Sequence, residues 1–125
     1  MSVLATLAGI HAGLGWTVVV ANGLAGLWAL GAERWPVLRM PALWRFTAGA
    51  QLAAFVEVVL GVVMVAGGDA PDLQFHMFYG FVMLAAIGII YSYRQQLRDR
   101  IYLLYGLGGV FIMGLGIRAL QAGPR

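Results

Sequence analysis

Cysteine and lysine are both absent from this 125-residue sequence, and charged residues of any kind are scarce. The lack of cysteine excludes disulfide bonds, cysteine-ligated zinc or iron–sulfur centres, and thiolate nucleophiles. Charged residues make up 10% of the chain, whereas a soluble domain carries roughly a quarter. Hydrophobic residues make up 62%. Lipid, not water, is therefore expected to cover most of the molecule, which is predicted to form a single domain over residues 1–125.

The motifs of soluble enzymes are missing as well. The sequence has no phosphate-binding glycine loop, no Ser-His-Asp set, no carboxylate pair and no acidic cluster with metal-ligand spacing. Hydrolytic chemistry therefore has no candidate residues, and catalytic residues stay unassigned. The net positive charge of the chain comes from eight arginines. In a membrane protein their positions set orientation, so we infer no nucleic-acid partner from them.

Four apolar stretches are each long enough to cross the hydrocarbon core, which takes about 20 helical residues. They cover residues 3–30, 46–66, 73–93 and 101–120. Each is expected to be helical, because backbone polar groups in lipid need partners within the same segment. The first stretch lacks the basic start of a signal peptide and is too long for one, so it is expected to be retained. The predicted fold is all-α, a polytopic membrane protein with an up-down-up-down four-helix bundle.

The connections between these stretches carry most of the charge. Residues 31–45 hold three arginines together with Trp35 and Trp44, and we expect this segment to be partly embedded at headgroup level. Residues 67–72 should form a tight turn, and residues 94–100 hold three more arginines. The positive-inside rule then places the arginine-rich connections in the cytoplasm and both termini outside, in the plasma (inner) membrane. Four tyrosines around the third connection are expected to form an aromatic belt there: Tyr91, Tyr93, Tyr102 and Tyr105.

A weak internal repeat relates the two halves of the chain. An offset of 65 residues places His11–Gly15 over His76–Gly80, so each half has a His-x3-Gly near the outer end of its first helix. Two parallel helix pairs would be related by a pseudo-two-fold axis along the membrane normal. Two alternatives explain this similarity: a duplication of the chain, or chance together with the shared composition of membrane segments.

The two histidines form the most specific candidate site. His11 and His76 are expected roughly 5–12 Å below the outer surface of the hydrocarbon core. In the predicted bundle their helices are diagonal and run in the same direction, so inward imidazoles could bind one haem iron from opposite sides. Glycines at this depth on every helix would leave room for the macrocycle: Gly9, Gly13, Gly15, Gly61, Gly80, Gly114 and Gly116. Arg118, on the outer side, could pair with a propionate. The sequence thus predicts one b-type haem, its iron held by the two histidines.

This arrangement resembles one half of haem A synthase, or a small membrane cytochrome b, in helix architecture but not in any motif. The alternatives stay open. The histidines could hydrogen-bond a neighbour or a headgroup, or bind a transition metal without haem. The glycines could serve close helix packing. Arg118 could pair with Asp69 or Asp72, or extend into the headgroups.

Glu57 is the one carboxylate deep within a predicted span. It lies nine residues from one end and eleven from the other, near the midplane, where an ionised carboxylate costs at least about 2.5 kcal/mol. We expect it to face the interior and to be protonated. It could carry protons, bind a cation, or hydrogen-bond a quinone or a polar group of a partner subunit. It could also simply join helices through hydrogen bonds, as Asn22 and Gln51 could. Four residues are expected at its depth: Trp16, Thr17, Met83 and Met113. Of these, Trp16 and Thr17 have side chains that could donate a hydrogen bond to it.

These observations leave three functional hypotheses. The first is a b-type haem-binding or electron-transfer subunit working near the outer leaflet. The second is a non-catalytic accessory or assembly subunit, which would dock a larger membrane complex, or another copy of the chain, through glycine-rich faces such as Gly9-x3-Gly13. The third is a small proton- or cation-coupled transporter that uses Glu57.

Overall fold

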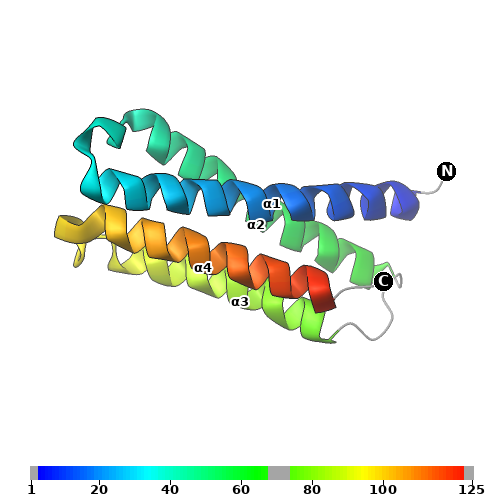
Figure 1. The fold of residues 1–125 in the computed structure, drawn as a ribbon. Helices are drawn as coiled ribbons and strands as arrows, with labels where there is room; N and C mark the ends of the chain where they lie inside the picture. The colour runs from blue at the N-terminus through cyan, green and yellow to red at the C-terminus, as the bar shows by residue number, and fades with distance from the viewer. Residues whose placement is uncertain (1–2, 68–73, 123–125) are drawn as a thin grey trace.

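The computed structural model describes residues 3–67 and 74–122, which form four long helices joined by short connections (Figure 1). All four helices are long and apolar enough to cross a membrane. The prediction of an all-α four-helix bundle is confirmed, and its helices suit a small multi-pass membrane protein. The helices are α1 (Val3–Arg34), α2 (Pro41–Ala66), α3 (Gln74–Tyr93) and α4 (Ile101–Ala122).

The segment at residues 31–45 is more helical than expected. Helix α1 continues to Arg34, and α2 begins at Pro41, so six residues with a short 3-10 turn at Pro36–Leu38 lie between them. Proline can begin a helix, because the N–H that it lacks would have no partner in the first turn. The two helices therefore take up most of the connection predicted at residues 31–45, and its embedding at headgroup level stays a prediction. The turn predicted at residues 67–72 lies almost wholly outside the described residues.

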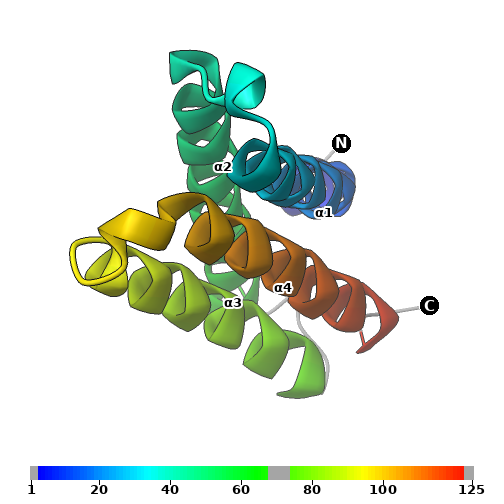
Figure 2. The same cartoon turned by 60° about the vertical axis from the view of Figure 1, so that its left-hand side comes forward.

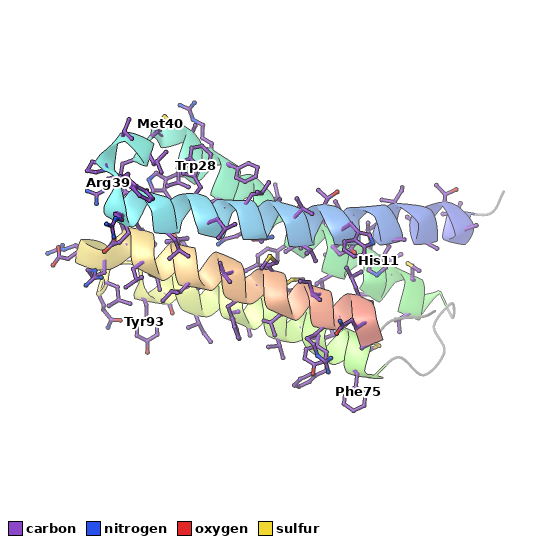
Figure 3. All side chains as sticks on the ribbon, in the orientation of Figure 1. His11, Trp28, Arg39, Met40, Phe75 and Tyr93 are labelled. Atoms are coloured by element: carbon purple, nitrogen blue, oxygen red, sulfur yellow. The ribbon has the colours of Figure 1, made fainter. Side chains whose placement is uncertain are left out.

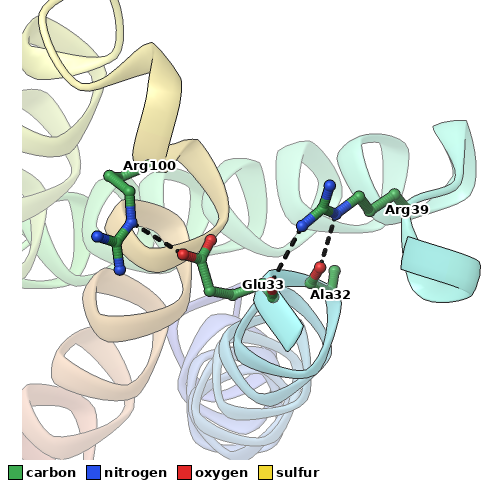
Figure 4. Close-up of polar contacts among 4 residues, drawn as sticks. All are labelled: Ala32, Glu33, Arg39 and Arg100. Atoms are coloured by element: carbon green, nitrogen blue, oxygen red, sulfur yellow. Dashed lines mark hydrogen bonds and ion pairs between the residues drawn. The ribbon is translucent and has the colours of Figure 1, made fainter. Parts of the chain in front are cut away.

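Arginine side chains fix this end of the bundle (Figure 4). Arg39 donates hydrogen bonds from Nε to the carbonyl oxygen of Ala32 at 2.7 Å and from Nη2 to that of Glu33 at 3.0 Å. These carbonyls belong to the last turn of α1, where intrahelical partners run out, and a cation there also complements the helix dipole. The Glu33 carboxylate in turn accepts a 2.9 Å hydrogen bond from Arg100, next to the start of α4.

The four helices pack unequally around the bundle (Figure 2). Helix α1 packs closely on α4 and α2, and α3 packs on α4, whereas α2 and α3 meet sparsely. The close α1–α4 crossing depends on glycine. A Cβ on Gly26 would lie 2.7 Å from the backbone nitrogen of Val110, and one on Gly109 would lie 2.7 Å from Gly26 Cα. An exact two-fold axis would make the α1–α4 and α2–α3 contacts alike, so the packing departs from that symmetry.

The aromatic residues near the arginine-rich end divide into two groups. The ring of Trp44 lies 5.4 Å from that of Tyr102 and 5.2 Å from that of Tyr105, centre to centre. These three rings cover a buried cluster formed by Ala29, Ala32 and Leu43. These rings thus also cover the end of the core, and their place in an aromatic belt at headgroup level stays a prediction. Trp35, Tyr91 and Tyr93 are exposed as expected.

Candidate functional site

The two histidines meet across the bundle. His11 comes from α1 and His76 from α3, and their ring centres lie 5.8 Å apart with the ring planes at 83°. Helices α1 and α3 are diagonal in the bundle and run in the same direction, as the sequence predicted. Figure 3 shows His11 toward the end of the bundle where α1 begins and α4 finishes.

The Nδ1 atom of each imidazole lies close to a polar group of another helix. His76 Nδ1 lies 2.7 Å from the carbonyl oxygen of Ala119 on α4. Because a carbonyl only accepts, this nitrogen carries the proton and Nε2 keeps a free lone pair. His11 Nδ1 lies 3.0 Å from Oε1 of Glu57 on α2. Neither of these two buried atoms has an aligned hydrogen bond within the described residues, so each is the other's close polar neighbour.

Glu57 lies at the depth of the histidines, and the expected neighbours on α1 were wrong. Trp16 is 62% exposed, and the Thr17 hydroxyl donates to the carbonyl oxygen of Gly13, one turn earlier on its own helix. Residues 16 and 17 share the approximate depth but lie on another face of α1 from His11. The depth of a residue in the membrane does not predict the rotation of α1 about its axis, which decides the face on which that residue lies. The two polar layers expected from the sequence are therefore one layer.

A cavity of about 270 Å³ surrounds this polar cluster. All four helices contribute to its walls, which are apolar apart from the two histidines and Glu57. Met83 lies in the wall as expected at this depth, whereas Met113 does not. The cavity reaches the outer surface of the bundle between α2 and α3, where its lining includes four exposed side chains: Val62, Val65, Met77 and Phe81.

Glycine gives the cavity its width. One glycine from each helix lies in the wall: Gly15, Gly61, Gly80 and Gly116. A Cβ on Gly15 would lie 2.8 Å from Glu57 Oε2, and one on Gly61 would lie 3.3 Å from His11 Cε1. Three other glycines that the sequence placed at this depth, Gly9, Gly13 and Gly114, have no such neighbour within 4 Å.

Arg118 does not line the cavity. It is exposed, its Nη1 donates to Gln121 Oε1 at 3.0 Å, and its guanidinium carbon lies 5.6 Å from the ring centre of Tyr79. Asp69 and Asp72, the expected alternative partners, lie outside the described residues. The pairing of Arg118 with a propionate stays a prediction.

Sequence reasoning missed two parts of the site, the contact of Glu57 with His11 and the Ala119 carbonyl, whereas it had placed Gly61 at this depth. The first had a usable signal, since Glu57 is nine residues from the outer end of α2 and His11 is eight from the outer end of α1. No protein family, curated protein or solved structure matches this chain. Within the described ranges, no group of three or more His, Cys, Asp or Glu side chains could hold a metal ion.

Proposed function

We propose that this protein binds one b-type haem, with Nε2 of His11 and Nε2 of His76 as axial ligands, and passes electrons at the end of the bundle where α1 begins. The observation that supports this most is the meeting of two imidazoles, of which His76 bonds through Nδ1 to the Ala119 carbonyl and His11 directs Nδ1 to the Glu57 carboxyl group 3.0 Å away. Metal-bound histidines almost always direct their second nitrogen to a carboxylate or a carbonyl, which orients the ring. Glu57 and the Ala119 carbonyl would have these two roles.

The spacing of the rings also supports haem. Metal–imidazole bonds are about 2.0 Å long, so two axial imidazoles on one iron have ring centres about 6 Å apart. The observed separation is 5.8 Å. A porphyrin supplies four equatorial nitrogens itself, so two protein ligands suffice. The macrocycle is wider than the cavity, and the opening between α2 and α3 gives its edge a place to extend.

The proposed orientation places the arginine-rich connections in the cytoplasm of a cell whose plasma membrane holds the protein. Six arginines lie at residues 34–45 and 94–100, in the α1–α2 and α3–α4 connections or within the adjoining helix turns. Both connections lie at the same end of the bundle (Figure 1). The positive-inside rule assigns that end to the cytoplasm. The haem would then lie near the outer leaflet.

Absorption spectroscopy tests haem binding. Protein purified from haem-replete cells should show a Soret band and, after dithionite reduction, a sharp α-band. His11→Ala and His76→Ala should each abolish the sharp α-band. Thr17→Ala, on α1 but directed away from the cavity, is the matched control and should keep the spectrum. Colourless wild-type protein that takes up no added haem would contradict the proposal.

A docking role in a larger membrane assembly, or in a homo-oligomer, is the second candidate. Gly9, Gly13, Gly49, Gly88 and Gly114 have nothing within 4 Å of an added Cβ, so these positions leave backbone open to close approach by another helix. Under this hypothesis Gly13→Leu should shift the protein from a larger assembly to the monomer in size-exclusion chromatography. An elution volume unchanged from wild type would count against docking through this face.

A further inference from the structure

A second cavity lies at the opposite end of the bundle from the histidines. Its volume is about 400 Å³, and its walls come from α2, the end of α3, the α3–α4 connection and the start of α4. It shares no lining residue with the histidine cavity. The side chains with polar groups in its lining, besides the aromatic ones, are Thr47, Gln51, Arg94, Gln95 and Arg98.

The charge of this cavity is positive and uncompensated. Arg94 and Arg98 line it, and no acidic residue does. Within the described residues neither arginine forms an ion pair with a carboxylate. Arg94 is held in place, because its guanidinium carbon lies 4.2 Å from the ring centre of Tyr91 and its Nη2 donates to the Tyr91 hydroxyl at 3.0 Å. Its other N–H donors are available, and guanidinium groups suit phosphate oxygens in geometry and charge.

The surroundings of the cavity indicate a ligand with apolar chains. Trp44, Tyr91 and Tyr105 line it, and such residues are typical of the membrane–water interface. Residues 44, 48 and 51 of α2 line this cavity, and residues 58, 62 and 65 line the histidine cavity. Steps of three, four and seven residues keep all six on one face of α2. The boundary between α2 and α3, where the two helices meet sparsely, connects the cavities along this face and is called the seam below.

We propose that this basic cavity binds the phosphate headgroup of an anionic phospholipid, whose acyl chains lie along the seam between α2 and α3. Basic pockets between transmembrane helices are suited to anionic lipid headgroups. A soluble phosphate ion would use the two arginines but would have no use for the aromatic wall or the seam. The headgroup site shares no lining residue with the histidine cavity, so substitutions of its arginines leave the proposed haem ligands in place.

Native mass spectrometry of the detergent-purified full chain tests this proposal. The probes are phosphatidylglycerol and phosphatidylcholine with identical acyl chains. Wild-type protein should retain one phosphatidylglycerol in preference to phosphatidylcholine. The double variant Arg94→Gln/Arg98→Gln should bind phosphatidylglycerol about tenfold more weakly or worse, because it loses both headgroup cations. The matched control Arg34→Gln/Arg45→Gln removes two exposed charges from the same end, outside the lining, and should bind as wild type does.

Three results would overturn the lipid site. They are equal retention of the two lipids, equal loss in both double variants, and release of bound phosphatidylglycerol by millimolar inorganic phosphate, which would indicate a site for a soluble anion. Circular dichroism checks that the variants fold. If the double variant does not fold, Arg98→Gln alone carries the test, since Arg98 is exposed and its loss should still weaken binding several-fold. Haem content and spectrum should be unchanged in either variant.

Discussion

At the scale of single residues, the contact between Glu57 and His11 determines the chemistry of the site. A carboxylate at Nδ1 increases the electron donation of Nε2 to a bound metal. On the other imidazole the partner is the Ala119 carbonyl, which is neutral. The two proposed axial ligands would therefore differ in strength, and Glu57 would act on a bound iron through His11 as a positioning residue.

Replacing Glu57 should change the reduction potential of a bound haem. Glu57→Gln replaces the carboxyl group beside His11 with an amide, which supports electron donation from the imidazole less well, so the ferric state loses stabilisation and the midpoint potential should rise. Haem affinity should fall about tenfold, the smaller effect typical of losing such a partner. Potentiometric titration and haem titration measure these changes. Glu33→Gln, at the arginine-rich end, is the control, and an equal potential in both variants would contradict the role of Glu57.

Two glycines on α1 offer a matched pair for the shape of the site. A Cβ at position 15 would lie 2.8 Å from Glu57 Oε2, whereas one at position 13 has nothing within 4 Å. Gly15→Ala should therefore displace the carboxylate from His11 and weaken haem binding several-fold, and Gly13→Ala should not. Haem titration of the two variants compares them directly. Equal affinities would show that Glu57 tolerates the added methyl group.

The sequence predicted which two histidines meet, because residue counts give depth and the up-down-up-down order gives diagonal helices. It could not predict the partner of Glu57. Depth alone left Trp16 and Thr17 as candidates, and the rotation of α1 about its axis decided against both. The Ala119 carbonyl could not be predicted either, because every residue has a backbone carbonyl and nothing in the sequence distinguishes this one.

At the scale of elements, the α1–α4 crossing is the firmest contact in the bundle. Gly26 and Gly109 bring the two backbones together, and a side chain at either position would meet backbone atoms, which cannot move aside as a flexible side chain can. The α2–α3 pair has no comparable contact. The bundle therefore has one closed side and one open side, and both cavities reach the surface on the open side.

Substitution at the crossing should destabilise the fold. Gly26→Ala forces α1 and α4 apart, and overpacking of this kind typically costs about 1–3 kcal/mol. The midpoint of unfolding in mixed micelles with increasing sodium dodecyl sulfate measures the change. Gly88→Ala on α3, where nothing lies within 4 Å of the added Cβ, should leave the midpoint close to wild type. A similar loss in both variants would mean that the crossing has no special role.

The existence and order of the four helices followed from hydrophobic length alone, since lipid leaves the backbone no other solution. Their ends were less predictable. The stretch before Phe46 carries prolines, arginines and tryptophans, which are typical of a connection, yet Pro41 begins α2. The interface tolerates polar residues on a helix, so composition does not mark where a helix in this region begins.

At the scale of the whole molecule, six of the eight arginines lie at residues 34–45 and 94–100, at the end of the bundle where α1 finishes and α4 begins, and the histidine cavity lies toward the other end, near Arg118. This polarity is the basis of the proposed orientation, and it separates the proposed haem site from the proposed headgroup site. The orientation stays a prediction from arginine counts. The unequal packing of α1–α4 and α2–α3 could not be predicted, because both pairs contain glycine-rich apolar helices.

The absence of native cysteine makes the orientation simple to test. Gln121, near the end of α4, and Gln96, in the α3–α4 connection, are both exposed, so each can be replaced by a single cysteine, as Gln121→Cys or Gln96→Cys. A membrane-impermeant maleimide should label the first in intact cells and the second only after permeabilisation, because the arginine-rich end is expected inside. The reverse pattern would invert the proposed orientation.

Electron paramagnetic resonance of the ferric protein tests the central claim most directly, because it reports the ligands on the iron. We expect a low-spin signal from the wild type, since two imidazoles give a strong axial field. His11→Ala and His76→Ala should each convert bound haem to high spin or lose it, and Thr17→Ala should keep the low-spin signal. Protein without haem, or a low-spin signal that survives either histidine substitution, would contradict joint ligation by His11 and His76.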